Sequence, residues 1–309
     1  MRCPRQQGVA LITVLLILSI LTVTGVAMLT RMNVSLHRSG NVWLAQQAYW
    51  YSVGVENWVT QILRLDAENS EIDSLDEAWA TPVDYLPIDG GAISGRLIDQ
   101  QGLFNLNSLM QGDVAMQHFA RLVELVTEAD IVTANRIAQA TRDWIDTDIN
   151  VTLPDGAEDN FYLGQTPPYR AANRPMASPS ELRLVAEMTP EFYAALAQYV
   201  TALPAATAIN VNTAPLPVLA SLHEQLDLGA VERLAEIRME TPWQSVQAFL
   251  QEDALAGLDI NAANLTTTSS YFLAAGQVVV DRGRIRYRSL FQRAEGGRTR
   301  LIAHSREVF

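Results

Sequence analysis

The sequence predicts an α+β protein built from a long N-terminal helix, a small antiparallel sheet and a large all-helical domain inserted into the helix-and-sheet part. Three observations support this class: an apolar run that continues into an amphipathic pattern, helix-start signals between 108 and 268, and strand-like runs separated by turns after 269. We expect a further short strand at 92–98 to join the C-terminal strands in one sheet.

The N-terminal helix begins as a membrane span. Residues 9–30 are uncharged and apolar, and at about 1.5 Å per residue they cover roughly the 30 Å core of a bilayer. The apolar region of a secretory signal peptide is about 7–15 residues long and ends at a small-residue cleavage site, which is missing here. Apolar residues then recur in steps of three and four up to Leu65, so we predict one helix over 9–65.

The remaining boundaries follow from local signals. Ser178 and Thr241 each precede a proline and a polar residue three positions on, which is typical of helix starts, and Thr189 precedes Pro190 in the same way. The chain therefore divides into a leader at 1–8, the helix at 9–65, a first α+β part at 66–107, the helical domain at 108–268 and the C-terminal sheet at 269–309.

Composition excludes several classes of function. A formal net charge of -12 over 309 residues repels phosphate backbones and argues against general nucleic-acid binding. Cys3 is the single cysteine, so neither an intramolecular disulfide nor a cysteine-based metal site can form. The four histidines are far apart and form no HExxH spacing, and we predict no catalytic residues.

The densest chemical cluster is the acidic run at 143–162, which contains no basic residue. Many carboxylates on one loop repel one another, and a hard divalent cation bound by oxygen ligands relieves that repulsion. We therefore predict a calcium site that lacks the spacing of an EF-hand, with the ligands Asp146, Asp148, Glu158 and Asp159. A solvated acidic loop, the DxD motif of nucleotide-sugar transferases at Asp146 and Asp148, and paired-carboxylate hydrolysis remain alternatives.

Two further patterns concern symmetry and charge. FNLNSL at 104–109 and INVNTAP at 209–215 share an Asn-x-Asn before a helix, which suggests an internal duplication.

Arg284, Arg286 and Arg288 alternate with other residues in a predicted strand, so they lie on one face. That face could take an acidic partner or nucleic acid, and the acidic remainder favours a merely solvated face.

The leader resembles that of type IV prepilins, because it is short, polar and basic and ends in glycine directly before the apolar run. The resemblance implies that a prepilin peptidase cuts between Gly8 and Val9 and leaves the helix attached. Members of this class usually carry glutamate at the fifth mature position, whereas this chain has Thr13. A subunit with no predecessor above it does not need that glutamate to pair with a neighbour's amino terminus.

The runs DWIDTD, GAEDNFY and PPYRAANRPMASPSELRLV, together with the Asn-x-Asn segments and the Gly8 leader, resemble the K-type minor pseudopilins of the type II secretion system. This resemblance implies a pilin-like helix and sheet with an inserted helical domain, calcium in that domain, and no enzymatic activity. It also implies a tip complex with the I-type and J-type minor pseudopilins above the major pseudopilin.

In that family the protein is anchored once in the inner membrane, its body lies in the periplasm, and it promotes export of folded proteins across the outer membrane. The alternative is a membrane-anchored DNA-binding protein of a competence-type system, because the segment at 232–250 is similar to helix-hairpin-helix modules. The preceding HEQLDLGAVE at 223–232 is acidic and has one glycine where such modules carry a glycine-rich turn, so we expect shared architecture and no nucleic-acid partner.

Overall fold

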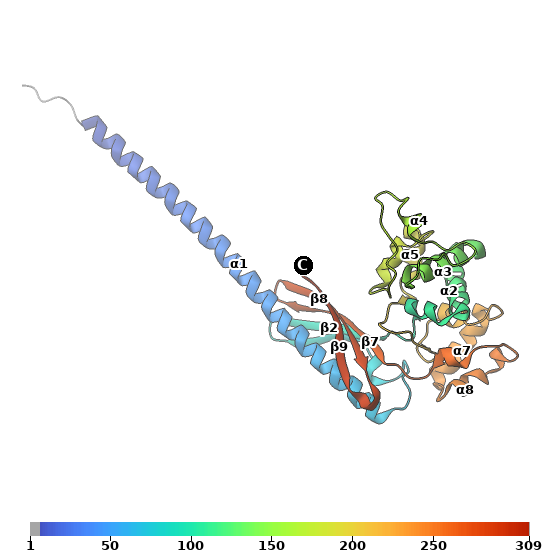
Figure 1. Cartoon of the computed structure of the whole chain (residues 1–309). Coiled ribbons are helices and arrows are strands. Elements are labelled where there is room, and N and C mark those ends of the chain that lie inside the picture. Colours follow the sequence, from blue (N-terminus) through green and yellow to red (C-terminus); the bar gives the residue numbers. More distant parts are fainter. Residues whose placement is uncertain (1–6, 309) are drawn as a thin grey trace, which may run out of the picture.

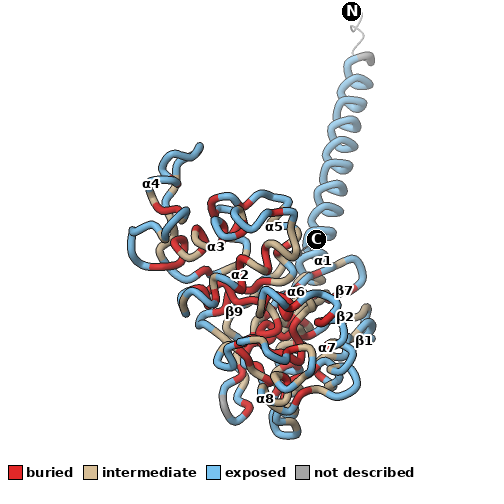
Figure 2. Tube along the Cα trace, turned by 90° about the vertical axis from the view of Figure 1, so that its right-hand side faces the viewer, coloured by how far each residue is buried: buried red, intermediate tan, exposed pale blue. Residues whose placement is uncertain are grey.

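The computed structural model describes residues 7–308, and the predicted leader falls mostly outside these residues. Helix α1 (Gln7–Asn69) extends away from the rest of the molecule as a long rod and is one continuous helix (Figure 1). It ends at Asn69, somewhat beyond the predicted end at 65. Its apolar first half is long enough to cross a membrane and is exposed along its whole length (Figure 2).

The second half of α1 packs on a five-stranded antiparallel sheet with the order β1-β2-β7-β8-β9. The strands are β1 (Val83–Ile88), β2 (Gly91–Asp99), β7 (Tyr271–Val280), β8 (Gly283–Arg293) and β9 (Thr299–Val308). The predicted strand at 92–98 is confirmed within β2, whereas the edge strand β1 was not predicted. Pro87 hides β1 in the sequence, because a proline argues against a strand except at the sheet edge, where β1 lies.

A continuous apolar core lies between α1 and the sheet. Val55, Val59 and Leu63 of α1 are buried against it, with Leu63 fully inaccessible. Trp79, from the 3-10 helix η1 (Ala78–Ala80), packs edge-on against Phe272 with ring centroids 5.2 Å apart. The sheet therefore packs along the second half of α1.

The long segment between β2 and β7 begins and ends on neighbouring strands of the sheet. Asp99 at the end of β2 is paired with Phe272 at the start of β7, so the intervening chain forms a separate lobe beside the sheet (Figure 1). That lobe has its own core, which includes Phe119, Leu122 and Phe249. Its longer helices are α2 (Asp113–Val126), α3 (Ile131–Ile145) and α7 (Leu228–Glu240).

The shorter elements of the inserted domain refine the prediction that it is all-helical. Two parallel pairs of very short strands occur in it, β3 with β4 and β5 with β6. The bounds are β3 (Phe104–Asn105), η2 (Leu106–Gln111), α4 (Asp159–Tyr162), η3 (Pro179–Leu184), α5 (Pro190–Leu196), β4 (Val200–Thr201), β5 (Ile209–Asn210), α6 (Leu216–Ala220), α8 (Val246–Leu250), η4 (Asp253–Leu255), η5 (Ala262–Asn264) and β6 (Leu265–Thr266). A last 3-10 turn, η6 (Glu295–Gly297), joins β8 to β9.

The first Asn-x-Asn motif organises the first half of the inserted domain. Asn105 Oδ1 accepts a hydrogen bond from the backbone nitrogen of Asn107 at 3.2 Å. The Asn107 amide then pairs with the backbone of Met176, accepting from its nitrogen at 2.8 Å and donating to its oxygen at 3.0 Å. Two residues later Ser178 caps η3, so one side chain fixes where the next helix begins.

The second motif repeats this arrangement. Asn210 Oδ1 accepts from Asn212 nitrogen at 3.0 Å, and the Asn212 amide pairs with the backbone of Trp243 at 3.0 and 2.9 Å. Ser245, again two residues later, caps α8. The two halves use the same device at equivalent places, as an internal duplication predicts.

A buried polar junction fixes the inserted domain to the sheet. Asn210 Nδ2 donates to Asp99 Oδ2 at 3.0 Å and to Ser269 Oγ at 2.9 Å, and Thr213 Oγ1 donates to Asp99 Oδ2 at 2.6 Å. Burial raises the pKa of Asp99, while these donors act in the opposite direction. The domain is therefore held by directional hydrogen bonds as well as by chain connection.

Candidate metal centre

Helix α3 brings the first acidic residues into the domain interior. Its start is fixed by Asp130, whose side chain accepts from Thr133 nitrogen at 2.8 Å. Its apolar face, which includes Ile137 and Trp144, is buried in the domain core. Because α3 ends at Ile145, Asp143 is buried in its last turn, and Asp146 lies directly after it.

Asp143 folds the acidic loop back onto α3. Its side chain is fully buried, and both carboxylate oxygens accept from Thr152 nitrogen, at 3.0 and 3.1 Å. Burial raises its pKa, and the bonds from Thr152 act against this rise. A Cβ at Gly156 would lie 2.1 Å from Asp143 Oδ2, so only glycine fits where the loop passes this carboxylate.

Asp146 and Glu158 are buried carboxylates without compensation. Their exposed fractions are 7% and 2%, and Asp146 Oδ1 and both Glu158 oxygens have no hydrogen-bond partner among the described residues. Burial, followed by the charges of Asp148 and Asp143, raises the pKa of Asp146 to about 6. Burial, followed by the charges of Asp143 and Asp146, raises the pKa of Glu158 to about 7.

Asn173 adds a neutral oxygen to this loop cluster. Its Nδ2 donates to the backbone oxygen of Asp148 at 3.1 Å, and its Oδ1 is buried without a partner in the described part of the chain. Its φ of 45° lies in the left-handed region, which is unfavourable for a residue other than glycine or asparagine. An asparagine therefore suits this position, because it adopts the left-handed conformation more readily than most residues.

The four predicted ligands separate into two pairs. Asp146 and Glu158 are buried near Asp143, whose charge raises the pKa of both, but among the described residues the oxygens of these three carboxylates are not gathered within 4.8 Å of one another. Asp148 turns its carboxylate to Asn150, and Asp159 accepts from Ala171 nitrogen at 3.1 Å. Asp159 also lies 3.7 Å from the exposed guanidinium of Arg170.

Sequence reasoning passed over two of the residues in this cluster. Asp143 belongs to the acidic run, but the sequence does not show that it lies in the inward-facing last turn of a helix. Asn173 lies in PPYRAANRP, beyond the run, and carries no local sign of its role. The oxygens of Asp146, Glu158 and Asn173 that lack donors among the described residues are of the kind that Ca²⁺ prefers, whereas both oxygens of Asp143 already accept from Thr152.

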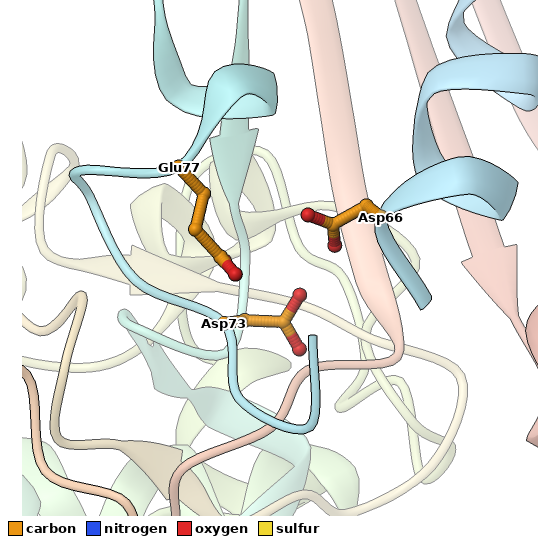
Figure 3. Close-up of side chains that lie close together, drawn as sticks. All are labelled: Asp66, Asp73 and Glu77. Carbon is orange, nitrogen blue, oxygen red and sulfur yellow. The ribbon is translucent and has the colours of Figure 1, made fainter. Parts of the chain in front are cut away.

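A second carboxylate cluster lies at the junction of α1 with the sheet (Figure 3). Oxygens of Asp66, Asp73 and Glu77 all fall within 4.8 Å of one another. Here Arg293 supplies the positive charge, through ion pairs with Asp66 at 2.8 Å and with Asp73. Glu77 accepts from Trp79 Nε1 at 2.9 Å. This cluster is an internal ion network that already contains its cation.

Ser289, His304 and Glu56 form a group that resembles a hydrolytic triad in composition. Ser289 Oγ and Glu56 Oε1 both contact the same ring nitrogen, His304 Nδ1, and Ser289 also donates to Glu56 at 2.8 Å. A triad needs the serine and the carboxylate on different ring nitrogens. Ser289 is also fully buried, so the group ties β8 and β9 to α1.

The helical hairpin similar to DNA-binding modules carries an acidic residue at the start of α7. Asp227 Oδ1 accepts from Ala230 nitrogen at 2.6 Å and so occupies the backbone donors that would face a phosphate. This geometry argues against the DNA-binding alternative.

Comparison with known proteins decides the family. Two family models described as type II secretion system (T2SS), protein K, match residues 102–205 and 209–269, which correspond to the two halves of the inserted domain. Type II secretion system protein K of Pseudomonas aeruginosa is 34% identical over 310 residues, which cover 96% of this chain and 92% of that protein. The chain belongs to the type II secretion system protein K family. The Klebsiella pneumoniae protein K is 36% identical, with coverage of 96% and 94%.

The chain is also similar to a solved structure. A chain in the crystal structure of the GspK-GspI-GspJ complex from the type 2 secretion system of enterotoxigenic Escherichia coli matches with a TM-score of 0.78 and 28% identity. The match covers 87% of this chain and 99% of that one. The predicted fold class and the role of a minor pseudopilin are therefore confirmed, and the apolar helix α1 is consistent with a single-pass membrane anchor.

Proposed function

We propose that this protein stands at the tip of the pseudopilus, where it helps to start assembly and promotes export of folded proteins from the periplasm across the outer membrane. It would assemble with the I-type and J-type minor pseudopilins, as GspK does with GspI and GspJ in the solved complex. The major pseudopilin would follow below. This role is structural and needs no catalytic site.

The observation that carries the proposal is the position of the inserted domain on the body. The turn before β8 lies beside Leu44 of α1, near the membrane end of the sheet, whereas the turn before β9 lies beside Ala67. The inserted domain joins the sheet at Asp99 and Phe272, near this second end. A domain at the end away from the membrane blocks the addition of a further subunit above, as a tip position requires.

We also propose that the protein is anchored in the inner membrane with its body in the periplasm, after a prepilin peptidase has cut between Gly8 and Val9. The test is mass analysis of the mature N-terminus from cells with and without this peptidase. A product that begins at Val9 only when the peptidase is present supports the proposal. A product that retains residues 1–8 in both contradicts it.

For the acidic loop we propose a structural calcium site formed by Asp143, Asp146, Glu158 and Asn173, with the backbone oxygen of Asp148. The ion would neutralise the buried carboxylates and hold the loop against α3. Two of the four ligands predicted from the sequence, Asp146 and Glu158, belong to this proposed site. The carboxylates of Asp148 and Asp159 do not bind the ion in it.

Calcium binding is tested by titration calorimetry of the full chain in detergent after treatment with a chelator. The double variant Asp146→Asn with Glu158→Gln should lose binding, while Asp84→Asn, on the exposed edge strand, should retain it. Equal heats from the wild type and the double variant would contradict the site.

A further inference from the structure

A cavity of about 240 Å³ lies in the apolar core between the second half of α1 and the sheet. Its walls come from α1, η1 and the strands β1, β2, β7 and β8. Protein interiors are packed as closely as organic crystals, and they contain few voids larger than a water molecule. A space of this size beneath α1 is therefore an exception to ordinary core packing.

Small residues of the sheet create the space. Gly95 on β2 and Ala274 on β7 line the cavity on the face that packs against α1. A Cβ at Gly95 or at Gly276 would lie 2.4 Å from the hydroxyl oxygen of Tyr287, so neither position has room for a side chain. Tyr287 also lines the cavity, and its hydroxyl therefore lies at the wall next to Gly95.

The hydroxyl of Tyr287 is a buried polar group with a weak partner. The residue is 3% exposed, and its hydroxyl donates to the backbone oxygen of Ser94 at 3.4 Å, whereas about 2.8 Å is typical of such bonds. Burial raises the pKa of Tyr287 to about 12, so the hydroxyl keeps its proton at neutral pH. A buried hydroxyl with so long a bond gains free energy from a closer partner.

The described residues contribute no charged side chain to the cavity. Arg96 is the one charged residue in the lining. Because side chains alternate along a strand, that of Arg96 points to the opposite face of β2 from Ile93 and Leu97, which are buried against α1. A charged ligand would lose its hydration here without gaining an opposite charge, so the cavity suits a neutral molecule.

The cavity opens to solvent away from the membrane. Trp58 of α1 and Thr81 before β1 both line it and are both exposed, so its mouth lies between these two segments. The uncharged part of α1 ends at Thr30. About 28 helical residues, or roughly 42 Å, separate this point from Trp58, so acyl chains of the bilayer do not reach the mouth.

The size of the cavity limits the ligand to a compact molecule. An apolar cavity of about 150 Å³ binds benzene, so the larger space here accommodates one ring or two small fused rings. We propose that the cavity binds a small neutral aromatic molecule with one hydrogen-bonding group, of the size of indole, and that the Tyr287 hydroxyl bonds to that group. This site is separate from the proposed tip role and does not depend on it.

The test measures binding of fluoroindole to the full chain in detergent by fluorine NMR. The wild type should bind it saturably, and a saturating amount should raise the melting temperature. Ala274→Leu fills the cavity and should abolish saturable binding. Ala275→Leu is the matched control: this residue is next along β7 but points to the other face of the sheet, so the variant should bind like the wild type.

Two further measurements examine the chemistry of the ligand. Tyr287→Phe removes only the hydroxyl and should weaken binding about threefold to tenfold. Fluorobenzoate, which has a similar ring and a negative charge, should show no saturable binding to the wild type. Saturable binding of fluorobenzoate that Ala274→Leu removes would contradict a site for neutral molecules.

Equal signals from the wild type and Ala274→Leu would show that fluoroindole only enters the detergent, and would overturn the site. If Ala274→Leu does not fold, unchanged affinity of Tyr287→Phe overturns the proposal. Displacement of fluoroindole by added I-type and J-type subunits would assign the cavity to a side chain of a neighbouring subunit instead of a small molecule.

Discussion

The molecule contains two buried clusters of carboxylates that are balanced in different ways. At the junction of α1 with the sheet, Asp66, Asp73 and Glu77 lie close together (Figure 3), and Arg293 forms ion pairs with Asp66 and Asp73. In the inserted domain the buried Asp146 and Glu158 of the acidic loop form no ion pair, and carboxylate oxygens of both stay without donors among the described residues.

This difference separates an ion network that is complete within the protein from buried carboxylates that lack a cation. A buried charge is tolerated when an opposite charge and hydrogen bonds accompany it. The first cluster contains its cation as a side chain, so proximity of carboxylates alone does not indicate a metal. In the second cluster Asp146 and Glu158 form no ion pair among the described residues, which is the reason that we propose an ion from solution there.

The largest expected effect comes from removing the internal cation. Arg293→Met should lower the stability of the body by about 3–5 kcal/mol, because Asp66 and Asp73 are then buried without a partner. The loss should be the same with and without calcium, as measured by thermal melting of the full chain. Arg64→Met is the control: its pair with Glu68 is half exposed, so the effect should stay below about 0.5 kcal/mol.

Calcium should stabilise the inserted domain alone. At a concentration about 100 times the dissociation constant, a ligand that binds only the folded state adds about 2.7 kcal/mol. We expect a chelator to lower the melting temperature of the wild type but not that of Glu158→Gln. Equal responses of the two proteins would show that calcium acts elsewhere.

The response to pH should distinguish the clusters further. The pKa of Glu158 is raised from 4.5 to about 7, so the folded calcium-free protein holds a proton that the unfolded chain releases. The free energy of unfolding of the calcium-free protein should therefore fall as the pH rises from about 4.5 to about 7, because the unfolded chain releases this proton first. Added calcium should remove this loss.

The pKa of Asp66 is raised from 3.8 to about 6, so Asp66 should also lower the free energy of unfolding as the pH rises through this range. Calcium should not change this contribution. Denaturant unfolding at several pH values, with calcium or chelator, measures both effects. A calcium-free stability that increases with pH over this range in wild type but not in Glu158→Gln would contradict the assignment.

The smallest effect is expected at Asp159. Because its carboxylate is engaged by Ala171 and Arg170, Asp159→Asn should change calcium affinity by only about threefold, whereas Asp146→Asn should weaken it about tenfold or more. Calorimetry of both variants tests this order. A larger effect at Asp159 would restore the ligand set predicted from sequence.

The features predicted correctly were those with local signals. The strand at 92–98, the helix starts near Ser178 and Thr189, and the repeated Asn-x-Asn all depend on residues a few positions apart. The helix start predicted at Thr241 was wrong, because Thr241 follows the end of α7 and the next helix begins after Ser245. β1 was missed because its pattern is interrupted by proline at a sheet edge, where the cost of a missing donor is small. The calcium site stays a prediction, and acidity indicates the loop but not which of its side chains turn inward, as Asp146 and Glu158 do.

The membrane helix and the acidic run can be read from the sequence by itself, because apolar length and charge density are properties of contiguous residues. The encounter of Arg293 with Asp66 and Asp73, more than 200 positions away, was decided by the tertiary structure. So was the approach of Asn173 to the loop that follows α3. Which charges meet depends on how distant segments pack, since burial and desolvation arise only after the chain has folded.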